Sequence, residues 1–278
     1  GRRGGFYAPS SMSVPPYPYP PYPEPERGRA DRVADAFPFA EETVTQGLRE
    51  ATITGEPYPV KGWMVYATNL MQAMPDQAAT LRAIQALDLL VVVDVLPSEI
   101  AGWADVVLPE TIYLERYDDL NVELFRDPFI ALRQPVVPAP ADQKPNWWIA
   151  RELAVRLGLG AYYPWRHIEE YLAHRLHAAG YSLALLRQQG IVRGPRPPIY
   201  FEEGAPAEFP TPSGKIEFYS NQLRAAGHDP VPKYRPTPEP PDGSFRLLYG
   251  RAPVHSFGRT QTNPLLHEMM PENEVWLN

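Results

Sequence analysis

Polar side chains follow three apolar, strand-like runs in the middle of the chain. Asn69 follows the first run, Asp94 ends the run Leu89–Val93, and Glu110 comes after the third run, which ends at Pro109. Ligands of open parallel sheets bind at the carboxyl ends of the strands. A carboxylate there can accept two N–H bonds from a guanine edge or bind ribose hydroxyls, and an Asn amide can donate and accept. These positions therefore indicate a nucleotide-type site.

Structural roles explain Asn69 and Asp94 equally well on spacing alone. Asp94 can cap the helix expected from Ser98, and Asn69 can simply make a turn. No GxGxxG pattern supports an ordinary dinucleotide site. The stretch PTPSGKIE lacks P-loop spacing, so Lys215 is interpreted as a strand-edge lysine.

A row of unlike polar side chains lies near the end of the chain, in LLYGRAPVHSFGRTQTNP. Its members are Arg251, His255, Arg259, Thr260, Gln261 and Asn263. Such a set of donors suits an anionic ligand rich in heteroatoms. A plain surface loop is the weaker explanation, because so many donors fall in one short run.

Other chemistry finds little support. His167, His174 and His177 share a helical face with Glu170 between them, so a zinc site is conceivable, but a solvated helix face is the preferred interpretation. No nucleophile motif is present, and no catalytic residue or metal ligand is predicted. With no cysteine, these residues supply no thiolate ligand, iron–sulfur cluster or disulfide.

Composition indicates a folded protein with long loops. Of the 278 residues, 44% are hydrophobic and 35 are proline, and the formal net charge is −7. The mild charge and the lack of Lys/Arg blocks argue against nucleic-acid binding. The longest apolar run, Leu89–Val93, cannot span a bilayer, and the first residues, GRRGGFYAPS, lack the apolar core of a secretory signal. Because the chain lacks an initiator Met and ends in a strand-like stretch, we expect a piece of a longer protein.

Periodicity and turn residues predict alternating strands and helices. Helices are expected at 38–53, from Pro75, from Ser98, at 145–158, 165–179 and 221–226, and strands at 63–68, 89–93, 106–108, 214–219 and 245–249. Residues 1–30 alternate Pro and Tyr. They are either a ligand for a proline-recognising domain or, as we prefer, an ordered loop held on a larger body by its tyrosines.

Five stretches resemble the molybdopterin oxidoreductases of the dimethyl sulfoxide reductase type. They are TNLMQAMPD, VVVDVLPSEIAGWADVVLPETIYLE with its specific ADVVLP segment, QKPNWWIARELAVRLGL, and TPSGKIEFYS with LLYGRAPVHSFGRTQTNP. Within that family, YLERYDDLNV and ALRQPVVPAP are most similar to polysulfide and thiosulfate reductase catalytic subunits. The pattern typical of nitrate and formate enzymes is absent at that place.

The resemblance implies an α/β fold. It comprises a Rossmann-like parallel-sheet domain with long Pro-rich loops and the start of a C-terminal β-barrel-type pterin-binding domain. The expected divisions are a Pro/Tyr-rich loop segment (1–44), the nucleotide-binding domain (45–160), a helical and irregular connection (161–243) and the beginning of the C-terminal domain (244–278).

The resemblance also implies cofactor contacts. Arg116 stands where the family often has Lys, and Asn146 where many members have Asp. The implied cofactor-binding residues are Asn69, Val93, Asp94, Arg116, Asn146, Gly250, Arg251, His255, Arg259, Thr260 and Asn263. The implied cofactor is molybdenum bis(molybdopterin guanine dinucleotide), with a [4Fe–4S] cluster and the metal ligand upstream of these residues.

The function implied is part of a catalytic subunit that reduces polysulfide or thiosulfate with electrons from quinol. The expected partners are an iron–sulfur electron-transfer subunit and a quinol-oxidising membrane subunit, at the periplasmic face of the membrane. Alternatives are the same family acting on tetrathionate, arsenate, nitrate or formate, or a non-catalytic scaffold of a membrane electron-transfer complex. The residues alone are expected to hold no molybdenum stably and to be inactive.

Overall fold

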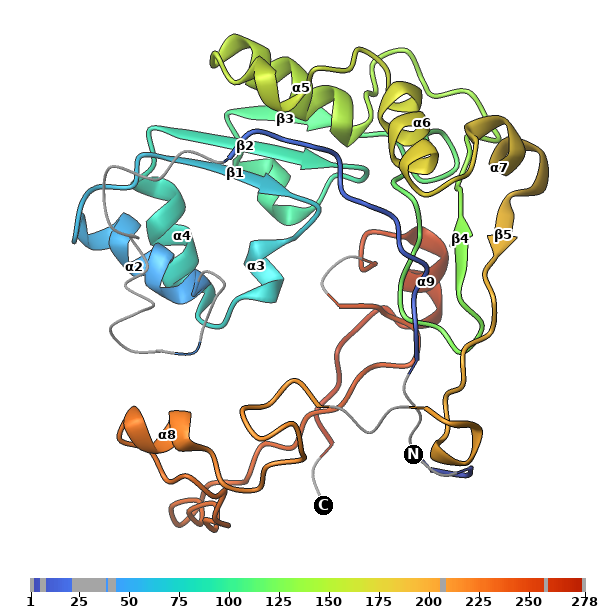
Figure 1. Cartoon of the computed structure of the whole chain (residues 1–278). Coiled ribbons are helices and arrows are strands. Elements are labelled where there is room, and N and C mark those ends of the chain that lie inside the picture. Colours follow the sequence, from blue (N-terminus) through green and yellow to red (C-terminus); the bar gives the residue numbers. More distant parts are fainter. Residues whose placement is uncertain are drawn as a thin grey trace. The chain divides into compact units, whose positions relative to one another are not determined.

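The computed structural model describes residues 3–5, 9–21, 39, 44–205, 209–257 and 260–276. The chain divides into two compact units. Figure 1 labels their helices and strands. The sheet unit comprises Pro25–Pro109 and Phe218–Asn278, and the helical unit comprises Gly1–Glu24 and Glu110–Glu217. The four sequence divisions given above stay a prediction.

The sheet unit is built around a three-stranded parallel sheet of order β1-β2-β3. Its elements are α2 (Thr45–Thr54), β1 (Gly62–Tyr66), α3 (Leu70–Ala73), α4 (Gln77–Gln85), β2 (Leu89–Asp94), the 3-10 helix η1 (Glu99–Trp103) and β3 (Val106–Pro109). The register sets Tyr66 opposite Val93 and Asp94 opposite Pro109. The predicted central α/β unit is therefore confirmed, with β1 ending two residues early.

One face of this sheet packs on helix α4. Trp63, Leu90 and Val92 are buried there together with Ala83 and Ile84 of the helix. Burying a side chain of this size stabilises the fold by about 1.5–3 kcal/mol. The strand period of two and the helix period of 3.6 in the sequence both direct apolar side chains to this contact.

Helix α4 starts at a side-chain cap. Asp76 lies at the N-cap with a φ of 60°, and its carboxylate accepts the N–H of Ala79 at 2.9 Å. The predicted helix at 38–53 is observed as α2, and its expected first turn with Glu41 and Glu42 lies outside the described residues.

The C-terminal part of the sheet unit contains two short helices, α8 (Asn221–Ala225) and α9 (Pro264–Met269). The strands predicted at 214–219 and 245–249 are wrong, because neither stretch is extended in a ladder. Phe218 is 84% exposed and Leu248 is 83% exposed. A strand needs a hydrogen-bonding neighbour, and the described residues offer these stretches none. The start of a barrel is accordingly not observed in 244–276.

The helical unit packs helices around an antiparallel strand pair. Its elements are β4 (Phe129–Ala131), α5 (Asn146–Arg156), η2 (Gly160–Tyr162), α6 (Ile168–Ala178), α7 (Leu183–Gln189), β5 (Ile191–Arg193) and η3 (Phe201–Glu203). The fully buried side chains Ile130, Leu172, Leu176 and Leu186 form its core. The predicted helices 145–158 and 165–179 are confirmed as α5 and α6, whereas α7 and the strand pair were not predicted.

Residues 9–21 form an extended strap on the helical unit. The Tyr17 ring lies 5.5 Å from the Tyr171 ring and 4.7 Å from the His174 ring, centroid to centroid. Arg175 donates to the Pro15 carbonyl at 3.2 Å, and the Tyr162 hydroxyl donates to the Pro21 carbonyl at 2.6 Å. The prediction of an ordered loop held by tyrosines is confirmed for these residues.

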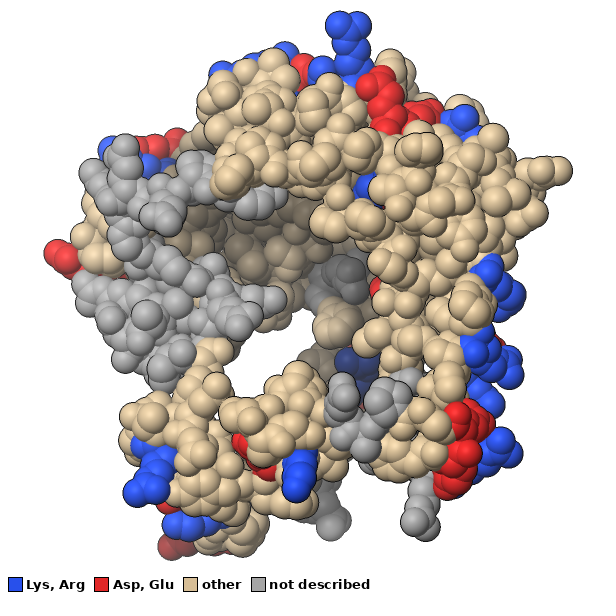
Figure 2. Space-filling view, viewed as in Figure 1, with Lys and Arg blue, Asp and Glu red and all other residues tan. Residues whose placement is uncertain are grey.

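One face of the molecule carries charges of both signs. On the face seen in Figure 2, Lys and Arg side chains are interspersed with Asp and Glu. Within the described residues, no helix is both long and apolar enough to cross a membrane.

Candidate functional site

The carboxyl edge of the parallel sheet places three predicted site residues in one neighbourhood. Val93 is fully buried near the end of β2, and Asp94 follows it as the last residue of the strand. Asn69 lies three residues beyond the end of β1, at the N-cap of α3, and is 3% exposed. Parallel register brings these strand ends to the same edge, as the sequence predicts.

The Asp94 carboxylate closes its own loop. Oδ1 accepts the N–H of Val95 at 2.7 Å, and Oδ2 accepts the Ser98 hydroxyl at 3.1 Å. Asp94 thus has a structural role within its loop, but these two bonds do not reach a backbone N–H of η1 and are not the helix cap considered on spacing. Each carboxylate oxygen has a further lone pair, so these bonds are compatible with a ligand contact, and the cofactor role of Asp94 stays a prediction.

Glu99 connects the two loops at this edge. Its Oε2 accepts from the Asn69 amide nitrogen and its Oε1 accepts from the Gln72 amide nitrogen. Glu99 is the first residue of η1, and Gln72 belongs to α3. One carboxylate therefore ties the loop after β1 to the loop after β2.

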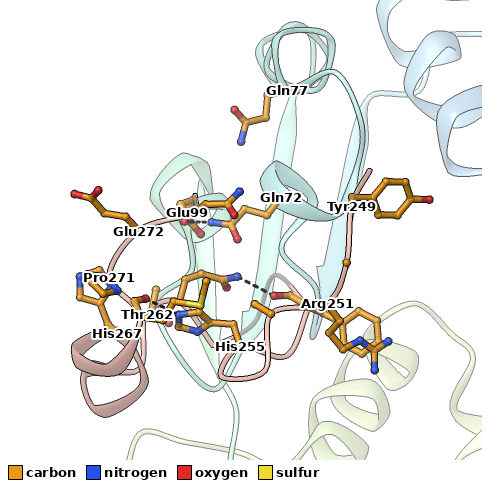
Figure 3. A pocket seen from close by; sticks show the side chains of 16 residues that line it. Gln72, Gln77, Glu99, Tyr249, Arg251, His255, Thr262, His267, Pro271 and Glu272 are labelled. Carbon is orange, nitrogen blue, oxygen red and sulfur yellow. Dashed lines mark hydrogen bonds between the residues drawn. The ribbon is translucent and has the colours of Figure 1, made fainter. Parts of the chain in front are cut away.

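A cavity of about 950 Å³ lies beside this connection, within the sheet unit (Figure 3). One wall comes from Gln72, Gln77 and Glu99, and the other comes from the C-terminal stretch 249–273. Arg251 and His255 are on that second wall. The amides and the carboxylate of the first wall and the guanidinium of Arg251 on the second suit a ligand that carries both donors and negative charge.

His255 fixes the fold of its own segment. Its Nε2 lies 2.9 Å from the carbonyl oxygen of Met270, which can only accept, so Nε2 carries the proton. Its Nδ1 lies 3.3 Å from the Thr260 hydroxyl, which accepts the Ser256 N–H at 2.9 Å. The structure thus brings His255 and Thr260 together, and their cofactor contacts stay a prediction.

The remaining predicted residues of this segment have separate surroundings. The Arg251 guanidinium lies 4.9 Å from the centroid of the Phe257 ring, and Phe257 has a φ of 54°. Asn263 caps α9 by accepting from Leu265 N at 3.1 Å and from Leu266 N at 3.3 Å.

Gly250 and Arg259 are the remaining predicted residues of this segment. Around Gly250 an added Cβ would meet nothing within 4 Å, so the backbone here does not require glycine. Arg259 lies outside the described residues.

The side-chain amide of Gln261 indicates what kind of ligand the cavity fits. Its Nε2 donates to the Phe257 carbonyl at 2.8 Å, and its Oε1 is buried without a hydrogen-bond partner among the described residues. A buried, unmatched acceptor costs about 1–3 kcal/mol. Because Gln261 lines the cavity, a ligand with amide-like N–H groups, such as a pterin or guanine ring, fits this donor and acceptor set.

Arg116 and Asn146 lie in the helical unit, around the buried carboxylate of Glu110. Arg116 forms an ion pair with Glu110 and also donates to Asp118 at 2.8 Å and to the Thr111 carbonyl at 2.5 Å. The Asn146 backbone N–H donates to Glu110 at 3.2 Å. Glu110 is 2% exposed. These two residues thus meet each other at Glu110, and their cofactor contacts stay a prediction.

Glu99, Gln72 and Gln77 were not among the predicted site residues. Their roles depend on how the loops after β1 and β2 approach each other, which no local pattern encodes. One signal was available: Glu99 lies five residues after Asp94, within the same strand-end loop.

Metal chemistry finds no separate place in the described residues. No group of three or more His, Asp or Glu side chains converges there as a metal site. His174 packs on Tyr17 instead.

Known proteins share long stretches with this chain. Residues 37–156 match the family model described as molybdopterin oxidoreductase. The thiosulfate reductase molybdopterin-containing subunit PhsA of Salmonella typhimurium is 33% identical over 276 residues, covering 90% of this chain and 36% of that protein. Acetylene hydratase of Syntrophotalea acetylenica is 33% identical over 187 residues, covering 67% of this chain and 25% of that protein.

A solved structure agrees with these sequence matches. Acetylene hydratase from Pelobacter acetylenicus superposes with a TM-score of 0.60 at 31% identity, over 70% of this chain and 26% of that one. The chain belongs to the molybdopterin oxidoreductase family. It spans roughly a quarter to a third of the length of these relatives.

Proposed function

We propose that this chain is part of the catalytic subunit of a molybdenum bis-pterin oxidoreductase, and that the sheet unit grips the nucleotide end of one pterin guanine dinucleotide. The observation that carries the proposal is the cavity lined by Gln72, Gln77 and Glu99 on one side and by the segment with Arg251 and His255 on the other. Family membership supports a molybdenum-pterin cofactor as the ligand.

The bound cofactor would supply the two-electron chemistry at molybdenum. This chain's residues would hold its organic part. Asn69 and Asp94 would meet the nucleotide, while Arg251 and Thr260 would meet the anionic and heteroatom-rich parts. His255 keeps the second wall in shape through Met270 and Thr260.

For the substrate we propose polysulfide or thiosulfate. The support is the thiosulfate reductase subunit, with 33% identity over 90% of this chain. Reduction of thiosulfate or polysulfide by the full-length protein with a reduced viologen dye tests the choice. Activity with nitrate or formate instead, and none with sulfur compounds, would overturn it in favour of another member of the family.

Acetylene hydratase provides a second candidate function. It is similar in both sequence and structure, with a TM-score of 0.60. Under this alternative the full-length protein would hydrate an alkyne without net transfer of electrons. Acetylene consumption measured beside the viologen assay separates the two functions, because a hydratase leaves the dye reduced.

Cofactor loading tests the grip itself. Asp94→Asn in the full-length protein keeps an acceptor for Val95 but replaces the second one with a donor, so we expect less pterin per protein. Ser98→Ala is the matched control, because it removes the 3.1 Å bond to Asp94 while the carboxylate stays. Equal pterin in wild type and Asp94→Asn would contradict the role of Asp94.

The proposal extends to partners and location. An iron–sulfur subunit and a quinol-oxidising membrane subunit would deliver electrons at the periplasmic face, and a [4Fe–4S] cluster would lie in the same catalytic subunit. A non-catalytic scaffold is the rival from another class. Metal and iron analysis of the purified full-length complex decides, since a scaffold would contain neither molybdenum nor pterin.

A further inference from the structure

The Asn69 side chain departs from the usual behaviour of its position. It lies at the N-cap of α3, where Asn normally accepts a hydrogen bond from a backbone N–H of the first turn. Here the side chain makes no capping bond. The helix start is held by the backbone alone, since the Asn69 carbonyl accepts from Gln72 N at 3.1 Å and from Ala73 N at 2.8 Å.

The amide is instead turned toward Glu99. A carboxylate has no proton to donate, so both groups that face it must present N–H. The amide nitrogens of Asn69 and Gln72 occupy its two oxygens. The carbonyl oxygens of both amides must therefore point away from Glu99. Figure 3 shows Gln72 and Glu99 next to each other on the cavity wall.

We propose that Glu99 is a positioning residue that sets the orientation of the Asn69 and Gln72 amides toward the bound dinucleotide. This inference rests on the proposed function and deepens it. Gln72 lines the cavity, so we assign to this wall the Gln72 amide oxygen, which is turned away from Glu99. The buried Asn69 amide is held by the same carboxylate. The ligand edge that fits such a wall carries N–H donors, as a guanine or pterin ring does.

Exchanging the Glu and Gln side chains of positions 99 and 72 in the full-length protein tests whether Glu99 orients the two amides. In Glu99→Gln the new amide accepts from only one neighbour and turns its NH2 group toward the other, so one of the two amides must flip. We expect pterin retention to fall about tenfold, the size typical of losing an outer-shell partner. In Gln72→Glu two carboxylates face each other, and retention falls as well.

The double variant Glu99→Gln/Gln72→Glu restores the pattern. The new amide at position 99 accepts from Asn69 and donates to the new carboxylate at position 72. Pterin retention is expected to return to within about twofold of wild type, since a matched pair recovers its coupling energy. Glu268→Gln, an exposed carboxylate of α9 outside the cavity lining, is the control and should change nothing.

The readout is pterin released per protein, measured by fluorescence after oxidation, together with the midpoint of thermal unfolding. Wild-type loading in Glu99→Gln would overturn the inference, as would a double variant no better than Glu99→Gln. If Glu99→Gln unfolds, the double variant alone decides by the same criterion. Absence of pterin from the wild type would instead contradict the proposed function itself.

Discussion

Asp105 and Leu90 bind each other at two points across β2 and β3. The Asp105 carboxylate accepts the Leu90 N–H at 2.7 Å, and the Asp105 N–H donates to the Leu90 carbonyl at 2.9 Å. The side chain thereby extends the parallel ladder one step before its first register pair, Val91 with Val106. The aspartate of the ADVVLP segment thus has a structural role in fixing how β3 enters the sheet.

Replacing this aspartate should destabilise the sheet unit. Asp105→Ala leaves the Leu90 N–H without its acceptor, and we expect a loss of about 1–2 kcal/mol in the free energy of unfolding. Asp88→Ala is the control, because its ion pair with Lys61 is about 70% exposed on both sides and such pairs contribute about 0–1 kcal/mol. Chemical denaturation measures the free energy of unfolding of both variants. Equal losses in Asp105→Ala and Asp88→Ala would contradict the structural role of Asp105.

Arg49 should prove essential for joining α2 to α4. Its guanidinium is buried and donates to the Pro75 carbonyl at 2.6 Å and to the Asp76 carbonyl at 3.3 Å. Arg49→Met strands these acceptors, so the free energy of unfolding should fall by about 1–3 kcal/mol.

Glu50→Ala provides the comparison for Arg49. Glu50 is the ion-pair partner of Arg49 at 3.6 Å, and the Glu50 side chain is 57% exposed. Its removal should change the free energy of unfolding by less than about 1 kcal/mol. A larger effect of Glu50→Ala than of Arg49→Met would refute the assignment.

Arg116 should matter first for stability. Arg116→Ala leaves the Glu110 carboxylate buried without its ion-pair partner, and breaking such a pair costs about 3–5 kcal/mol. In the double variant Arg116→Met/Glu110→Gln no charge is left buried, so much of the loss should be recovered. Pterin content of that double variant in the full-length protein then decides whether Arg116 also contacts the cofactor.

Alkaline pH should weaken the helical unit through Tyr171. Burial raises the pKa of this phenol, and the nearby Asp119 carboxylate raises it further. Below a pH of about 10 the phenol is protonated in both folded and unfolded chains, so its contribution is fully present. As the pH rises above that value, the unfolded chain loses the proton while the folded chain keeps it, and stability falls.

Tyr171→Phe isolates this effect from the other tyrosines of the chain. Free energies of unfolding measured from pH 8 to 11 should decline more steeply in wild type than in the variant. Parallel curves would show that Tyr171 titrates normally in the folded protein.

Local patterns predicted the sheet unit well. The buried run at β2, the helix start after Pro75 and the turn after β1 each involve neighbours in sequence, so local patterns can indicate them. The positions of Asn69 and Asp94 followed from the rule for parallel strand ends.

Features that depend on distant neighbours escaped prediction. The stretch around Leu248 has strand-like residues but no partner in the described part of the chain, and propensity alone does not make a strand. Glu99 became informative only once its contacts with Asn69 and Gln72 were seen. Arg116 and Asn146 were grouped by resemblance, whereas their shared partner Glu110 became apparent from the structure.

The strap of residues 9–21 has a consequence for the order of folding. It belongs to the same unit as residues Glu110–Glu217, so the strap is synthesised well before the helices on which it docks. Its hydrogen bonds from Arg175 and Tyr162 span 160 and 141 residues of sequence, and contacts of such separation form slowly. During synthesis the strap therefore stays without its partners until the helices that bind it have been made. The parallel sheet, whose residues lie between the strap and those helices in the sequence, is made in the interval.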